Sequence, residues 1–135
     1  MSLDEILASV ILIPRKHYDF GNVSMYSLLA SSGYLEFPED ISEEDILHAL
    51  QLHPECIQDW RAYSEDKRTS GWYLMEPSEG RFGVGFIPST GGNGVDPLMY
   101  SDEARACAAF IKLEMKYMKD AVFQSEERPN NCLDK

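Results

Sequence analysis

The spacing of the hydrophobic residues changes along this chain at Gly71. Before Gly71, apolar residues recur three and four positions apart, which is the period of an amphipathic helix. In residues 72–76 and 81–87 large apolar residues alternate, which is typical of strands with one buried face. A helical pattern then returns after residue 101. This order predicts an α+β domain, in which helices pack on a small antiparallel sheet.

The N-terminal third of the chain is expected to form two helices. Residues 3–13 have apolar side chains at helical spacing, and Pro14 is expected to end this helix. Residues 15–22 are predicted to be a connector. Residues 23–34 predict a short second helix that Gly33 closes at its C-terminal end.

Residues 37–71 carry the clearest helical pattern. Ser42 and Asp45 are spaced as in a capping box, with Asp in place of the usual Glu. Pro54 should break this helix and begin another, because proline is tolerated in the first turn of a helix. The segment therefore predicts two consecutive helices.

The middle of the chain predicts a β-hairpin followed by a third strand. Residues 77–80, Pro-Ser-Glu-Gly, have turn composition between the two alternating segments. Gly83 and Gly85 alternate with large apolar residues, which indicates a close packing contact or a bulge. Residues 97–101 are predicted to be the third strand.

A long helix is predicted from Ser101, as its N-cap, to about Phe123. Phe110 and Leu113 lie off its main apolar stripe, so the helix should be packed on two sides or take part in a subunit contact, and a homodimer stays open. The stripe consists of Ala104, Cys107, Ala108, Ile111, Met115, Met118 and Val122. We expect one domain over residues 1–123, with four or five helices on a three-stranded sheet, and a flexible tail over 124–135.

The net charge of the 135-residue chain is −11, and the acidic residues are concentrated. Residues 36–66 contain ten acidic residues and one basic residue, Arg61, and so contribute −9 of this charge. Such a surface repels nucleic acid and anionic membranes and attracts basic partners. The alternative is a solvated surface that keeps the protein soluble.

The sequence favours a cytoplasmic protein. Its N-terminal apolar segment opens with Asp4 and Glu5, unlike a secretory signal, and no apolar run approaches the 18 residues of a membrane span. Cys56, Cys107 and Cys132 are an odd number at wide spacing, which fits a reducing compartment.

Motifs for catalysis and cofactor binding are missing. The glycine-rich residues 89–94 lack the lysine of a phosphate loop, and Asp96 would repel phosphate, so this segment is interpreted as a connection between strands. The group Asp45, His48, His53 and Cys56 lacks the spacing of a zinc site, and Cys107 lies among alanines as a small apolar residue. We expect no cofactor, no metal and no enzymatic activity.

In the absence of such motifs, we expect the chain to bind a protein partner. Residues 64–73 combine charges with Trp72 and Tyr73, which point to opposite faces of a strand, so that one should be in the core and one accessible. Tyrosine is a frequent anchor of interfaces. The predicted partner-binding residues are Glu39, Asp40, Glu43, Glu44, Asp45, Asp59, Glu65, Asp66 and Tyr73.

Residues 41–115 resemble a group of small bacterial proteins associated with the immunity proteins of polymorphic and contact-dependent toxin systems. The segment "SEDKRTSGWY" is the most specific part of the resemblance. The resemblance implies a protein that covers the active site of a cognate toxin, in particular a basic nuclease domain. The alternatives are a small-ligand-binding or regulatory domain and, least favoured by the missing motifs, a small enzyme.

Overall fold

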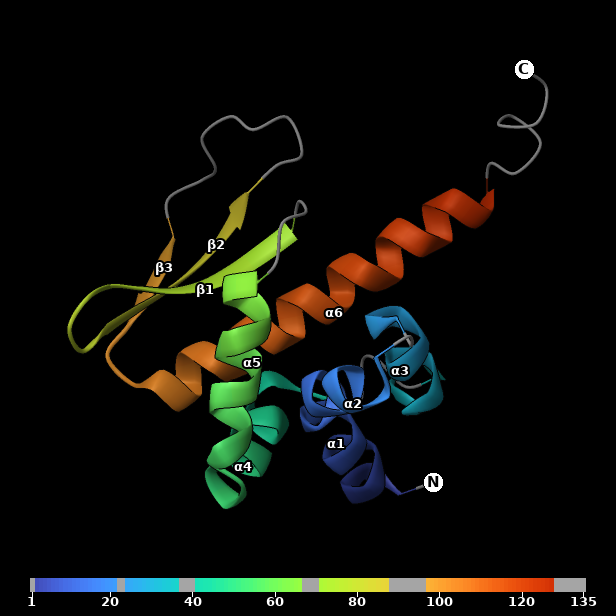
Figure 1. Ribbon diagram of the computed structural model, residues 1–135, viewed down its shortest axis with the longest axis horizontal. Coiled ribbons are helices and arrows are strands. Elements are labelled where there is room, and N and C mark those ends of the chain that lie inside the picture. Colours follow the sequence, from blue (N-terminus) through green and yellow to red (C-terminus); the bar gives the residue numbers. More distant parts are fainter. Residues whose placement is uncertain (1, 22–23, 37–40, 67–70, 88–96, 128–135) are drawn as a thin grey trace.

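The computed structural model describes residues 2–21, 24–36, 41–66, 71–87 and 97–127, with the backbone alone at residue 66 and from 121 onward. These residues form an α+β fold that ends in a long helix (Figure 1). The helices are α1 (Leu3–Ile11), α2 (Ile13–Phe20), α3 (Met25–Ser31), the 3₁₀ turn η1 (Tyr34–Glu36), α4 (Glu43–Leu52), α5 (Glu55–Asp66) and α6 (Glu103–Glu127). The strands are β1 (Gly71–Ser78), β2 (Arg81–Ile87) and β3 (Leu98–Tyr100).

Helix α6 separates the sheet from α1, α2 and α3, whereas α5 also contacts β1 directly (Figure 1). Helix α6 contacts all three strands and also α3, α4 and α5. Phe110, Ile111 and Met115 in its first half are completely buried. The prediction of a helix packed on two sides is therefore confirmed.

Trp60 of α5 connects three helices in the core. Its indole Nε1 donates a hydrogen bond to the carbonyl oxygen of Ile11, at the end of α1, over 3.2 Å. Its ring meets Phe110 of α6 edge to face, with 6.1 Å between the ring centres. Both contacts fit a buried tryptophan, which needs a partner for its N–H as well as apolar neighbours.

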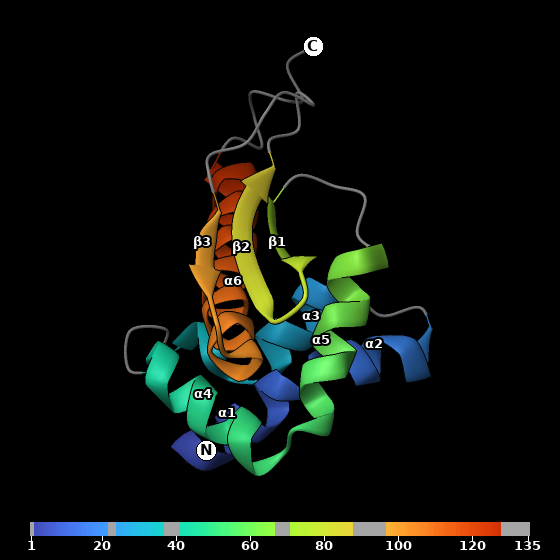
Figure 2. The same cartoon turned by 90° about the vertical axis from the view of Figure 1, so that its left-hand side faces the viewer.

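The three strands form an antiparallel sheet in the order β1-β2-β3, and Figure 2 shows them side by side in front of α6. Leu74, Val84 and Leu98 lie opposite one another across the sheet. The turn of the hairpin is shorter than predicted, because β1 continues to Ser78 across an irregularity in register. Gly80 makes the turn with a φ of 77°, which glycine adopts without strain.

Gly83 is closely packed, so that a side chain there would require its neighbours to shift. A Cβ atom there would lie 3.2 Å from Cγ of Met75 and 3.3 Å from Sδ of Met99. These two methionines come from the neighbouring strands and cover the glycine on the sheet face opposite Leu74 and Val84. The close packing expected from the glycine pattern is confirmed.

The starts of helices α1, α4 and α5 are set by residues close to them in the sequence. Both halves of the capping box between Ser42 and Asp45 are present, and Ser2 forms a second capping box with Glu5 at the start of α1. Pro54 separates α4 from α5. The capping boxes join side chains only three residues apart, and Pro54 acts on the backbone at its own position, so both kinds of feature depend on local sequence.

Three boundaries differ from the prediction. Most of the expected connector 15–22 belongs to α2, because Pro14 lies in the first turn of that helix instead of merely ending α1. The N-cap of α6 is Asp102, not Ser101: Asp102 Oδ1 accepts a hydrogen bond from the backbone N–H of Ala104 over 3.2 Å. The backbone of α6 continues to Glu127, and residues 128–135 lie outside the described residues.

Replacement of Ile111 by alanine should destabilise the protein by about 2–5 kcal/mol, because the side chain is completely buried. Urea unfolding measures the loss. The control is Lys116→Ala on an exposed face of the same helix, for which we expect a change within about 0.5 kcal/mol. Equal effects of the two substitutions would contradict the packing of α6.

Candidate functional site

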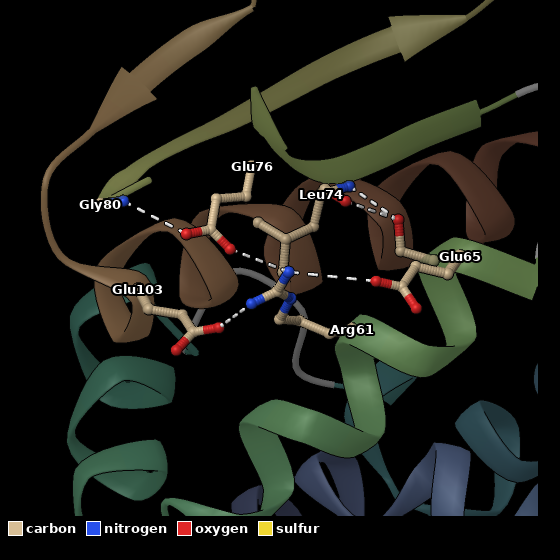
Figure 3. Close-up of polar contacts among 7 residues, drawn as sticks. Arg61, Glu65, Leu74, Glu76, Gly80 and Glu103 are labelled. Carbon is tan, nitrogen blue, oxygen red and sulfur yellow. Dashed lines mark hydrogen bonds and ion pairs between the residues drawn. The ribbon is translucent and has the colours of Figure 1, made fainter. Parts of the chain in front are cut away.

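Arg61 is the centre of a group of charged side chains where α5, the hairpin and the start of α6 meet (Figure 3). Its guanidinium lies 2.7 Å from Oε2 of Glu103 and 3.1 Å from Oε1 of Glu76. Glu65, one helical turn further along α5, lies 4.0 Å away. We call these four residues the Arg61 cluster.

The Arg61 cluster has more negative than positive charge. Three carboxylates surround one guanidinium group, whose pKa is raised above its ordinary value chiefly by the hydrogen bond to Glu103. Glu76 also accepts a hydrogen bond from the backbone N–H of Gly80 over 3.2 Å and so supports the hairpin turn. Since one arginine cannot neutralise three carboxylates, the cluster carries a net charge of −2.

The start of α4 extends the negative charge beside the start of α6. Glu44 of α4 is paired with Arg105 of α6 over 2.8 Å, and its side chain is 69% exposed. Burial raises the pKa of Tyr100, at the end of β3, and the negative charge of Glu43 raises it further. Helices α4 and α6 therefore bring their acidic first turns together at the end of β3.

We define the acidic surface by the carboxylates that these contacts connect. They are Glu43, Glu44, Glu65, Glu76, Asp102 and Glu103. Against these six stand the guanidinium groups of Arg61 and Arg105, which leaves a balance of −4. The described part of the chain therefore has an excess of negative charge at the ends of α4, α5 and α6 and on the hairpin.

Asp59 lies apart from the acidic surface. It faces α2, where Arg15 donates two hydrogen bonds of 3.2 Å to its carboxylate. This pair lines a shallow depression of about 210 Å³ together with Tyr18 and Asp19. The predicted acidic residues therefore divide between two regions of the surface.

The other predicted partner-binding residues lie outside the acidic surface or outside the described residues. Asp45 is engaged in the capping box of α4. Tyr73 is half-buried and lies opposite Gly85, on the sheet face away from Leu74. Asp66 is described only by its backbone, and residues 39 and 40 lie outside the described residues, as do residues 89–94.

Glu114 was not predicted from the sequence, and neither were Glu76, Asp102 and Glu103 of the acidic surface. Glu114 is 1% exposed in α6 and accepts hydrogen bonds from the hydroxyl of Tyr63 over 2.6 Å and from the backbone N–H of Trp72 over 3.0 Å. Burial raises the pKa of Tyr63 above its ordinary value, and the negative charge of Glu114 raises it further. The sequence contained a signal for the burial of Glu114, because Glu114 follows Ile111 by three residues and so shares an apolar face of the helix with it.

Neither cysteine in the described part of the chain is placed for nucleophilic attack. Burial raises the pKa of Cys56 to about 11, and Cys107 is completely buried, which also raises its pKa. A thiol with a raised pKa is protonated, and hence a poor nucleophile, at neutral pH. Among the described residues, no three His, Cys, Asp or Glu side chains are arranged to hold a metal ion.

Whether one of the described helices could span a membrane depends on its length and its apolar character. None of them, α6 included, combines the length and the apolar character that a membrane span requires.

Tyr63→Phe should destabilise the protein by about 1.5–3 kcal/mol, since it removes a hydrogen bond to a buried carboxylate. It should also change the response to alkaline pH. The raised pKa means that folded Tyr63 keeps its proton where the unfolded chain loses it, so its contribution is complete below the ordinary value of 10.0 and is lost as the pH rises above it. Urea unfolding between pH 7 and 11 should show a less steep decline for Tyr63→Phe.

Glu114→Gln is the matched variant for this experiment. In a double-mutant cycle the two substitutions should be strongly non-additive, because they act on one hydrogen bond. Additive effects would contradict the coupling of Tyr63 and Glu114.

No family model, curated protein or solved structure matches this chain. Its described residues form an acidic surface built by α4, α5, α6 and the hairpin, beside a sheet that carries Tyr73.

Proposed function

We propose that this chain is a cytoplasmic, non-catalytic binding protein that neutralises a basic partner protein, as an immunity protein does when it covers a toxin domain. The acidic surface supports this proposal, since its balance of −4 favours a positively charged partner. The size of the chain and its net charge of −11 fit the same role.

The position of Glu65 is the observation that carries the proposal. Glu65 lies in the last turn of α5, where no basic residue is present and where a negative charge is unfavourable for the helix dipole. Its side chain is 68% exposed and only 4.0 Å from Arg61, a long ion pair that contributes little to stability. A charge that does not help the fold favours a role in binding.

The other carboxylates of the acidic surface have roles in the fold as well. Glu43 and Glu44 lie in the first turn of α4 and Glu103 in the first turn of α6, where negative charge stabilises a helix. Asp102 caps α6. The fold thus accounts for part of the negative charge, and Glu65 exceeds what the fold requires.

A small-ligand-binding domain is less well supported. The depression beside Arg15 and Asp59 has a volume of about 210 Å³, below the roughly 300–1,000 Å³ of ligand pockets. Arg15 and Asp59 already satisfy each other through two hydrogen bonds.

Glu44→Gln/Glu65→Gln should slow association with the proposed basic toxin domain several-fold and change dissociation less, because exposed charges act on the encounter. Stopped-flow binding at low and high salt measures both rates, and the effect should fade as salt screens the charges. The double variant should lose little stability, because the loss of the first-turn charge of Glu44 in α4 is offset by the removal of Glu65, which opposes the dipole of α5.

The matched control is Asp19→Asn/Glu55→Gln. It also removes one carboxylate from the first turn and one from the last turn of a helix, and both residues lie outside the acidic surface. Equal association rates for the two double variants would assign the acidic surface to solubility alone.

Tyr73→Ala should mainly accelerate dissociation, in contrast to the charge variants. Tyr73 is half-buried on the sheet face opposite Leu74 and Val84, and the loss of an aromatic contact at an interface acts mainly on the lifetime of the complex. Tyr73→Phe keeps the ring and should remain close to the unmodified chain. An unchanged dissociation rate for Tyr73→Ala would place Tyr73 outside the interface.

A further inference from the structure

The two outer edges of the sheet, formed by β1 and β3, differ in the partners of their outward backbone groups. At the β1 edge, Ser64 of α5 accepts a hydrogen bond from the backbone N–H of Leu74 over 2.9 Å and donates one to its carbonyl oxygen over 3.1 Å. The next outward N–H, of Trp72, is bound by Glu114. Helices α5 and α6 thus bind three outward backbone groups of this edge, and covering an edge in this way is a common means of preventing unwanted strand pairing.

The β3 edge presents backbone groups outward at Met99. The backbone N–H and C=O of Leu74 are bound to Ser64 on the outer side of β1, so Leu74 and Val84 form a non-hydrogen-bonded pair. The N–H and C=O of Val84 therefore point away from β1 and toward β3. Val84 is opposite Leu98, so the alternation of an antiparallel ladder turns the N–H and C=O of Met99 away from the sheet. Figure 2 shows no described helix or strand beyond this edge.

The side chains at this edge are apolar and accessible. Leu98 is 54% exposed and Met99 is 40% exposed, and they lie on opposite faces of the sheet. β3 contains no charged residue that would repel another strand. Pro97, immediately before β3, lacks an N–H, which limits pairing on that side to its carbonyl oxygen.

Charge indicates what can bind here. β3 leads directly into the acidic surface: Tyr100 is beside Glu43, and Asp102 is exposed two residues further on. A second copy of this chain would bring further negative charge, whereas a segment with Lys or Arg next to an apolar stretch complements both the edge and the acids.

We infer that β3 is a docking edge for an extended segment of the basic partner, which adds a fourth strand to the sheet. A residue of that segment opposite Met99 exchanges two backbone hydrogen bonds with it, and apolar side chains of the segment cover Leu98 on one face and Met99 on the other. A basic residue beside the strand lies against Asp102 and Glu43. The basic character of the segment rests on the function proposed above, and the strand addition rests on the open edge.

The test uses a capped nine-residue peptide, with alternating valine and threonine between terminal arginines, titrated into the ¹⁵N-labelled protein. The peptide should shift the amide signals of residues 98–101 and slow hydrogen exchange of the Met99 amide at least tenfold. A peptide of the same sequence with methylated valine and threonine nitrogens cannot donate the hydrogen bonds and should bind at least tenfold more weakly. Exchange at Met99 that does not change with bound peptide would overturn the inference.

Met99→Pro and Met99→Val form the matched pair of variants. Both lose the methionine side chain, but only proline removes the outward N–H, at a position where no hydrogen bond within the sheet is lost. Met99→Pro should bind the peptide at least tenfold more weakly than Met99→Val, with thermal unfolding as the check that both variants fold. Equal binding by two folded variants would overturn the inference.

The remaining outcomes separate the inference from the proposed function. If the unmodified chain forms a dimer in sedimentation experiments and Met99→Pro abolishes it, the edge belongs to a second copy and the inference is overturned. If Met99→Pro binds the basic toxin domain as well as Met99→Val does, strand addition is wrong and the proposed function stands. If the arginine peptide and one with glutamate in place of arginine bind equally at the edge, strand addition stands and the basic character of the partner does not.

Discussion

The buried carboxylate of Glu114 is the interaction on which the arrangement of the other elements depends. Removing an ionised group from water costs several kcal/mol unless hydrogen bonds replace the lost solvation. Tyr63 of α5 and the backbone of Trp72 in β1 supply such bonds, so α5, β1 and α6 must be in place together. Trp60, three residues before Tyr63, packs on Phe110 of α6 and strengthens the same junction.

The geometry of the surface follows from this junction. With α5 held against α6, Arg61 reaches Glu103 at the start of α6 and Glu76 at the end of β1. The same junction lets Ser64 satisfy the backbone of Leu74 at one edge of the sheet. One side of α5 therefore stabilises the core, and its C-terminal end carries charge toward the solvent, where it is available to a partner.

Stability and binding place different demands on the acidic residues. First-turn carboxylates of α4 and α6 stabilise their helices whatever else they do, so their presence alone says little about function. Glu65 opposes the dipole of α5 and has a distant partner, which separates it from the others. The two edges of the sheet differ in a similar way, since side chains of α5 and α6 bind the outward backbone groups of Leu74 and the N–H of Trp72 in β1, whereas the backbone groups of Met99 in β3 are directed outward.

Local features were determined by the sequence itself. The capping boxes, the break at Pro54, the hairpin and the close packing at Gly83 each involve residues that are near one another in the chain or in a register set by alternation. Pro14 shows the limit of such reasoning, because the same residue is compatible with the end of one helix and with the first turn of the next.

Only the tertiary structure decided which charges lie together. Arg61 and Glu103 are 42 residues apart in the chain, and Tyr63 and Glu114 are 51 apart. Asp59 belongs to the same acidic stretch as Glu65, yet it faces α2 and pairs with Arg15. The direction in which a helix turns a side chain depends on which face the core buries, and residues from α6 and the sheet, distant in sequence, determine that burial.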